Sequence, residues 1–198
     1  MINMPQENVA YNEPQRFEFY NGVPRMMAPA RAEHVTVAAN IFVEFRNYLK
    51  HKKCKPFADG VSYILRENKK TEFIPDVSIL CDTTKIHKNG KIYGAPDLAV
   101  EVFSKSTGKR DRMEKLPEYA KAGTQEFWIV NPYLKNVEVY LLNGESYILD
   151  NVYQYYDEEL MEDYNDDPDP NKEIPPQEIK VSLYDDLIIK LEDIFDLW

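Results

Sequence analysis

Carboxylates stand in two apolar segments of this chain that otherwise have the composition of buried β-strands. Asp76 lies in FIPDVSIL (73–80), and Asp97 and Glu101 lie in PDLAVEVF (96–103). Carboxylates on neighbouring strands can hold a hard divalent cation such as Mg²⁺ or Mn²⁺. A cation held in this way can activate water for attack on a phosphodiester. The competing interpretation is a strand end whose carboxylates are neutralised by salt bridges.

Strand parity decides which of these side chains can act together. The apolar packing face of the second segment consists of Leu98, Val100 and Val102. Asp97 and Glu101 therefore lie on the opposite face, with only the small Ala99 between them. Because buried carboxylates are costly when they have no partner, this face requires a cation, a basic side chain or solvent.

A charged helix is predicted directly after this strand, over residues 109–122, with Gly123 at its C-terminal end. Pro117 predicts a kink or a restart within it. Positive charge gathers at the N-terminus, where the helix dipole disfavours it. The residues concerned are Lys105, Lys109, Arg110 and Arg112. Two interpretations stay open: they bind a phosphate group, or they form a solvated basic face.

The order of these motifs resembles the Uma-two family. The motifs are PDVSIL, PDLAVEVFSKST, Asp-x-x-x-Lys-x-x-x-Tyr over 111–119, and AGTQEFWIVNP, and the resemblance extends from about Phe17 to the C-terminus. It implies a restriction-endonuclease-like fold related to the PD-(D/E)xK nucleases, a mixed α+β domain with a central mixed sheet, flanking helices and an N-terminal hairpin. The implied activity is Mg²⁺- or Mn²⁺-dependent hydrolysis of phosphodiester bonds in DNA by a bacterial cytoplasmic endonuclease.

The resemblance also implies roles for individual residues. Asp76 and Glu101 match the metal ligands, and the backbone carbonyl of Val102 is the candidate for a third. Asp97 either supports these ligands or only begins its strand. His34 matches a histidine at the start of the family's first helix, and it is either catalytic or a buried structural residue.

The sequence departs from the nuclease pattern at Phe103. The pattern places a lysine two residues after the Glu, where the chemistry needs a cation to orient water and stabilise charge on the phosphate. Lys115 on the following helix and Lys105 in the turn are the candidates to replace it. We expect the Lys115 amine to lie close to the Glu101 carboxylate. If neither lysine serves, the chain is a catalytically inactive nuclease-fold module for binding or assembly.

Length and periodicity predict the remaining organisation. The 198 residues fit one domain over 15–198, preceded by a disordered stretch over 1–14. Asn21-Gly22 predicts a hairpin turn, and residues 82–94 read as a polar mobile loop. A helix is predicted over 31–50. Its expected apolar face consists of Val35, Ala38, Phe42, Phe45 and Leu49.

The charge distribution and the cysteine content limit which partners and which cellular compartment are expected. The net charge is −10, but residues 157–173 hold nine acidic residues and one lysine, whereas residues 1–156 hold 21 basic and 19 acidic residues. The acidic segment predicts an exposed flexible loop. The near-neutral remainder lacks the strongly basic face of a DNA-binding protein. The charge distribution therefore gives no support of its own to DNA, which is the expected partner. A homodimer is compatible with the sequence.

Cys54 and Cys81 lack the spacing of metal ligands, so two reduced thiols in a cytoplasmic protein are expected. No segment is apolar and long enough to span a membrane, and we expect no membrane partner.

Overall fold

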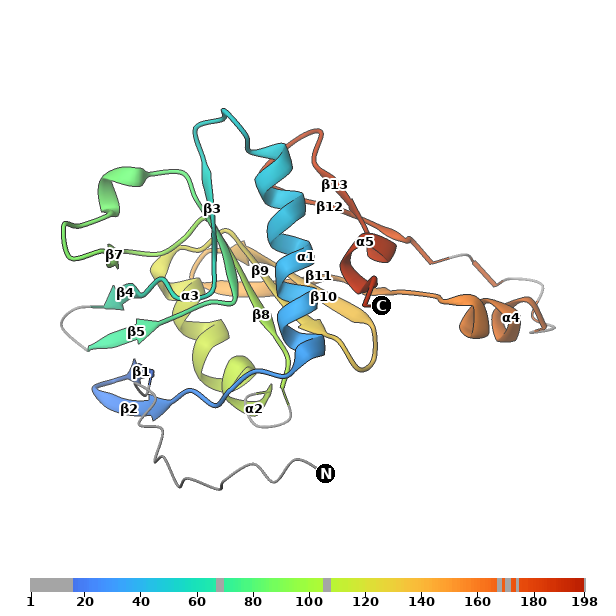
Figure 1. Ribbon diagram of the computed structural model, residues 1–198, viewed down its shortest axis with the longest axis horizontal. Helices are drawn as coiled ribbons and strands as arrows, with labels where there is room; N and C mark the ends of the chain where they lie inside the picture. The colour runs from blue at the N-terminus through green and yellow to red at the C-terminus, as the bar shows by residue number, and fades with distance from the viewer. Residues whose placement is uncertain are drawn as a thin grey trace, which may run out of the picture.

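A six-stranded mixed sheet forms the centre of the molecule (Figure 1). The computed structural model describes residues 16–66, 70–104, 108–166, 169, 172–173 and 175–197. The predicted disorder of residues 1–14 lies outside this range. The strands of the sheet are, in spatial order, β11 (Ser146–Gln154), β10 (Asn136–Asn143), β9 (Glu126–Asn131), β8 (Leu98–Val102), β6 (Val77–Leu80) and β3 (Lys55–Ala58). The class is mixed α+β, as the sequence predicts.

Strand β8 is central and carries Glu101. It pairs in parallel with β9 and antiparallel with β6. A parallel pair needs a crossover connection, which is why a helical segment must follow β8 before the chain enters β9. Every residue of β8 is buried, as expected for a strand covered on both faces.

A smaller five-stranded sheet contains the N-terminal hairpin. Its order is β2 (Val23–Met26), β1 (Phe17–Tyr20), β5 (Thr71–Phe73), β4 (Tyr63–Arg66) and β7 (Ile92–Tyr93). Asn21 and Gly22 both have positive φ, as a two-residue hairpin turn requires. The predicted loop over 82–94 is more structured than expected, because η2 (Thr83–Lys85) lies within it and the buried Ile92 pairs with β4.

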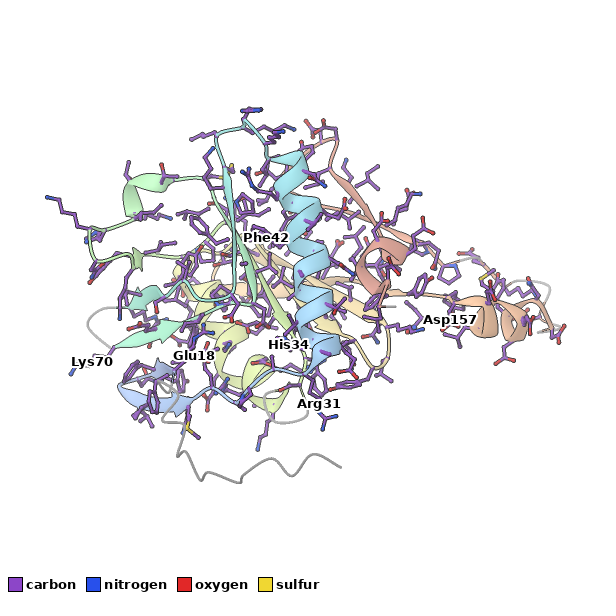
Figure 2. All side chains as sticks on the ribbon, in the orientation of Figure 1. Glu18, Arg31, His34, Phe42, Lys70 and Asp157 are labelled. Atoms are coloured by element: carbon purple, nitrogen blue, oxygen red, sulfur yellow. A yellow bond between two sulfur atoms is a disulfide. The ribbon has the colours of Figure 1, made fainter. Side chains whose placement is uncertain are left out.

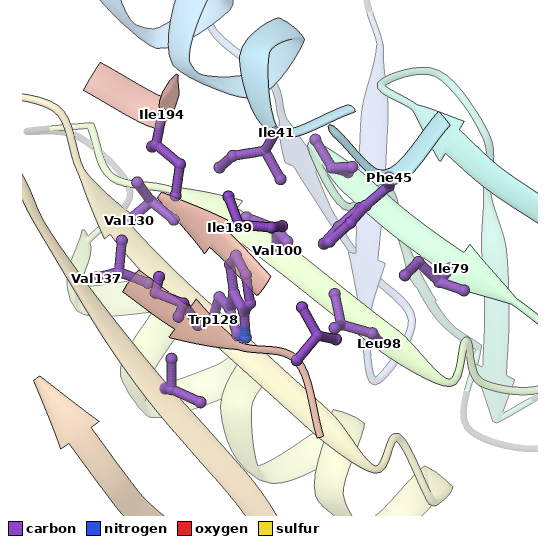
Figure 3. Close-up of a cluster of buried hydrophobic side chains, with 14 of the residues drawn as sticks. Ile41, Phe45, Ile79, Leu98, Val100, Trp128, Val130, Val137, Ile189 and Ile194 are labelled. Atoms are coloured by element: carbon purple, nitrogen blue, oxygen red, sulfur yellow. The ribbon is translucent and has the colours of Figure 1, made fainter. Parts of the chain in front are cut away.

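Helix α1 (Ala32–Tyr48) covers one face of the central sheet (Figure 1). Ile41 and Phe45 point onto Val100 and Leu98, as Figure 3 shows. The same core takes in β12 (Glu178–Lys180), β13 (Ile188–Lys190) and α5 (Leu191–Phe195). The predicted face was wrong at one end: Val37 is buried, whereas Val35 is 54% exposed. The buried positions recur every four residues, so the contact stripe begins at residue 37.

A helical segment over residues 108–122 covers the other face. It consists of α2 (Gly108–Arg110), the π-helical turn η3 (Asp111–Lys115) and α3 (Leu116–Ala122). The Leu116 N–H bonds to the Asp111 carbonyl, five residues back. This widened turn directly precedes Pro117, whose ring would clash with a normal helical carbonyl. Gly123 ends the segment with a φ of 92°, as predicted.

The acidic segment is not wholly a flexible loop, which corrects the sequence prediction. Residues Glu158–Asp166 form helix α4, which projects away from the central sheet (Figure 1). The Asp157 side chain caps it by accepting a hydrogen bond from the Leu160 N–H at 3.1 Å. None of the helices in the described part of the chain has the length and apolarity of a membrane span.

The two cysteines form a disulfide, which contradicts the expectation of reduced thiols. Lys55 of β3 pairs with Leu80 of β6, so Cys54 and Cys81 are the next opposed residues in the same antiparallel register. The bond therefore fastens the edge strand β3 to the strand that begins beside Asp76.

Gly108 begins the helical segment, and its Cα–H contacts the ring of Phe103. A Cβ at this position would overlap the ring. Alanine normally stabilises a helix by about 1 kcal/mol relative to glycine, but overpacking costs about 1–3 kcal/mol. We therefore expect Gly108→Ala to lower the free energy of unfolding, measured in urea. In a Phe103→Ala background the same change should raise it. Stabilisation of the wild type by Gly108→Ala would contradict this packing.

Candidate active site

Asp76 and Glu101 lie side by side at the ends of two neighbouring strands. Val77 pairs with Val100, and the Asp76 N–H donates to the Val100 carbonyl at 3.1 Å, which places Asp76 opposite Glu101 in the antiparallel register. Opposed residues project from the same face of a sheet. Both side chains are buried, Glu101 more completely than Asp76. The structure thus brings together the two carboxylates that the sequence predicts as partners.

Asp76 is held by the end of β8 and by the first turn of α1. Its Oδ2 atom accepts a hydrogen bond from the Val102 N–H at 2.7 Å and lies 3.3 Å from Nε2 of His34. His34 also makes a backbone hydrogen bond with Val102 that favours the charged imidazole, so the Val102 carbonyl is the acceptor. Figure 2 shows His34 near the lower end of α1. The predicted residues His34, Asp76 and Val102 therefore meet.

Two opposing effects set the pKa of His34. Burial disfavours the charged imidazole, but the hydrogen bond and charge of Asp76, the Val102 backbone and the more distant Asp59 outweigh it. The pKa of His34 is therefore raised above its ordinary value. In its protonated form, which the raised pKa favours, His34 is a cation that orients Asp76.

Glu101 forms a buried ion pair with Lys115. The Lys115 Nζ atom lies 2.8 Å from Oε2 of Glu101, and the Tyr119 hydroxyl donates to Oε1 at 3.4 Å. The expected approach of Lys115 to Glu101 is therefore found. The amine comes from the π-helical turn, which sits over the end of β8 because the crossover returns the chain across the sheet.

Glu18 is a site residue that sequence reasoning missed. It lies on β1 and is 1% exposed. Its Oε1 atom lies 2.8 Å from Lys115 Nζ and accepts from the Ile74 N–H at 2.9 Å, and its Oε2 atom lies 3.1 Å from Arg110. The available signal was its isolation as an acid within the apolar run FEFY of a predicted strand.

Negative charge exceeds positive charge in this buried region. The carboxylates of Asp76, Glu101, Glu18 and Asp111 face Lys115, Arg110 and His34. The pKa of Glu101 is raised well above its usual range, first by burial, with Lys115 opposing and the neighbouring carboxylates adding to the rise. Burial would lower the pKa of Lys115, but the same carboxylates outweigh it and raise that pKa. The neighbouring carboxylates contribute to both shifts, and a cation bound beside them would relieve this excess of negative charge.

The donor set suits a hard cation in chemical type. Asp76, Glu101 and the Val102 carbonyl are the oxygen donors present at the strand ends. Among the described residues, no group of three or more His, Cys, Asp or Glu side chains has the arrangement of a metal site. Metal binding would therefore draw on the backbone carbonyl and on solvent, as Mg²⁺ sites commonly do.

The other predicted residues lie away from this centre or are engaged elsewhere. Asp97 accepts from the Cys81 N–H at 2.7 Å at the opposite end of β8, so it begins its strand and does not support the ligands. Of the predicted phosphate-binding cations, Arg110 pairs with Glu18 and Arg112 with Glu138, whereas Lys109 is exposed. Lys105 lies outside the described residues.

Phe103 occupies the position of the lysine in the nuclease pattern. Its ring lies against Gly108, and the Arg112 guanidinium lies 6.0 Å from the ring centroid. The aromatic side chain therefore packs on the start of the crossover helix, and the cation that reaches Glu101 comes from that helix instead.

Comparisons with known proteins identify the family and the fold of the chain. A family model described as "Uma2: Putative restriction endonuclease" matches residues 5–164. A solved structure from Anabaena variabilis, described as a putative nuclease belonging to DUF820, superposes with a TM-score of 0.63 at 17% sequence identity. The match covers 91% of this chain and 90% of that one, and it shows a shared fold. No curated protein matches the chain.

The ionisation of His34 gives a direct check on its contact with Asp76. Because the folded-state pKa is raised, protonated His34 stabilises the fold fully below about pH 6.5, and this contribution is lost as pH rises through the raised value. In metal-free buffer, NMR titration should find His34 titrating above an unstructured histidine peptide. Asp76→Asn should lower the value clearly, and Asp59→Asn only slightly. A wild-type value at or below that of the peptide would contradict the assignment.

Proposed function

Because the chain belongs to the Uma2 family, we propose that it is a nuclease that uses Mg²⁺ or Mn²⁺ to hydrolyse phosphodiester bonds in DNA. The observation that carries the proposal is the buried cluster in which Asp76 and Glu101 lie on adjacent strands and Lys115 contacts Glu101 at 2.8 Å. Two carboxylates can hold the metal ion that activates water for phosphodiester hydrolysis, and a lysine can stabilise the charge that develops on the phosphate.

In this proposal Asp76, Glu101 and the Val102 carbonyl hold the metal ion. The ion supplies charge stabilisation and lowers the pKa of bound water when it is present. The protein shields the two carboxylates from bulk water. It fixes the position of Asp76 through His34 and the Val102 N–H. His34 is a positioning residue in this account, since its contacts are with Asp76 and the backbone.

Lys115 acts as a fixed positive charge. Its raised pKa keeps the ammonium protonated at neutral pH, which excludes it as a general base in this state of the site. A charged amine at this place can orient the attacking water and stabilise charge that develops on the phosphate. The role matches that of the missing lysine at Phe103, supplied from the next helix.

One observation favours the rival function, a binding or assembly module without catalysis. Arg110 and Arg112 are ion-paired within the chain, which removes two of the predicted phosphate contacts. The rival predicts neither metal binding at Glu101 nor metal-dependent cleavage, so the experiments on the ligands and the lysine separate the two functions.

Removing either predicted ligand should abolish metal binding and cleavage without unfolding the protein. Glu101→Gln and Asp76→Asn keep the side-chain shape, so the protein should stay folded, but each loses a buried ion pair, with Lys115 or with His34, and its melting temperature should fall. Calorimetric titration with Mg²⁺ and Mn²⁺ should show one site in the wild type and none in these variants. Glu138→Gln, which alters a partly exposed ion pair with Arg112, is the matched control. Wild-type cleavage by Glu101→Gln would refute the assignment.

Removing the lysine should separate binding from chemistry. Lys115→Met should reduce kcat by about 10²–10³-fold, the usual cost of losing one charge-stabilising group. Metal affinity should be spared, because the variant also frees Glu101 from its ion pair. Lys121→Met is the control, since Lys121 is an exposed lysine on the same helical segment that pairs with Glu118. Unchanged turnover in Lys115→Met would exclude the proposed role.

A further inference from the structure

Glu18 joins three elements that meet at the site. Its carboxylate contacts Lys115 and Arg110 on the crossover helix and the Ile74 N–H on the segment that leads into Asp76. The residue itself comes from the N-terminal hairpin, more than fifty positions away in the chain. Figure 2 shows Glu18 and His34 at the same end of the molecule.

The contacts of Lys115 are shared between two carboxylates at equal distance. Nζ lies 2.8 Å from Glu101 and 2.8 Å from Glu18, and Asp111 is farther away at 4.0 Å. Lys115 itself is 2% exposed, so solvent cannot replace a lost partner. If Glu101 were its sole partner, the lysine and a metal ion would compete for the same carboxylate.

Glu18 is fixed independently of Glu101. The Ile74 N–H and Arg110 hold it from two other directions, and both contacts are within the buried part of the structure. A carboxylate held in this way can keep an ammonium in place even when the second carboxylate changes partner.

We propose that Glu18 is a positioning residue that retains Lys115 beside the site when Glu101 is engaged by the metal ion. This inference rests on the proposed function. It makes the N-terminal hairpin a part of the active site, because the hairpin supplies the anchor for the cation that the nuclease pattern would place on the strand.

Glu18→Gln tests the inference, because the amide preserves an acceptor for the Ile74 N–H and removes the charge that holds Lys115. Glu118→Gln is the matched control: Glu118 is also buried, lies on the same helical segment and pairs with Arg66 and Lys121. We expect Glu18→Gln to lower kcat by about 10–100-fold, the usual effect of removing a supporting partner. The control should stay near the wild type.

A double-mutant cycle separates positioning from general stability. If Glu18 acts through Lys115, the double variant Glu18→Gln/Lys115→Met should be no more than about 3-fold slower than Lys115→Met alone. Multiplied losses in the double variant would overturn the inference, since Glu18 would then act by another route.

A structural readout keeps this test separate from the proposed function. A buried, ion-paired lysine ammonium exchanges its protons slowly, so ¹⁵N NMR should detect the Lys115 Nζ signal, assigned by its loss in Lys115→Met. In Glu18→Gln, proton exchange should accelerate by about 10-fold or more, as expected on losing a charge-assisted hydrogen bond. Glu118→Gln should leave it unchanged. Unaltered exchange in Glu18→Gln would overturn the inference whether or not the protein cleaves DNA.

If Glu18→Gln does not fold, the wild type still gives an answer. Saturation with Mg²⁺ should leave the Lys115 ammonium signal slowly exchanging, because Glu18 still holds it. Loss of the signal at saturation, in a protein that remains folded, would show that Glu18 does not retain the lysine.

If calorimetry shows no Mg²⁺ binding, the proposed function fails, and the inference that Glu18 anchors Lys115 during catalysis fails with it. The contact between Glu18 and Lys115 is still tested separately, by Glu18→Asp. That variant keeps the charge but shortens the side chain, so the Lys115 ammonium should exchange its protons faster than in the wild type, whereas unchanged exchange would show that Glu18 does not hold the lysine.

Discussion

An excess of buried negative charge around one ammonium group is the constraint on which the rest of the site depends. Lys115 contacts Glu18 and Glu101, and Asp76 and Asp111 add further negative charge nearby. Burying carboxylates in this number is unfavourable unless they are paired or hydrogen-bonded. Structures that tolerate such a cost commonly do so at functional sites. The charge imbalance therefore explains the fixed lysine, and it supports the proposal that the site binds a further cation.

The fold meets this constraint by bringing five separate segments to one end of the central sheet. The antiparallel register of β6 and β8 sets Asp76 beside Glu101. The parallel pairing of β8 with β9 requires the crossover helix that carries Lys115. The hairpin contributes Glu18, and α1 contributes His34. The π-helical turn, placed just before Pro117, is the local feature that directs Asp111 and Lys115 inward together.

Local rules predicted the parts of the site that lie on regular elements. Alternation along β8 placed Glu101 on the face opposite Val100, and helical continuity after the strand brought Lys115 to it. Sequence reasoning missed Glu18 because alternation in FEFY favours burial of the phenylalanines. The structure instead buries Glu18 and leaves Phe17 38% exposed. Tertiary pairing with Lys115 and Arg110 overrides the pattern there.

Sequence reasoning also missed the disulfide, because the approach of the two cysteines depends on the register between β3 and β6. Helix α4 was predictable from Asp157, a residue type that caps helix N-termini, but the acidic composition of the segment favoured the prediction of a flexible loop.

The central claim is that Asp76 and Glu101 share a divalent cation while Lys115 remains beside them. The most direct measurement is a crystal structure of the protein soaked in Mn²⁺, with the metal located by anomalous scattering. The account predicts one strong peak bonded to a carboxylate oxygen of Asp76 and of Glu101, with the Lys115 amine still in contact with Glu18. Absence of a peak at saturating Mn²⁺, with Glu101 still paired only to Lys115, would contradict it.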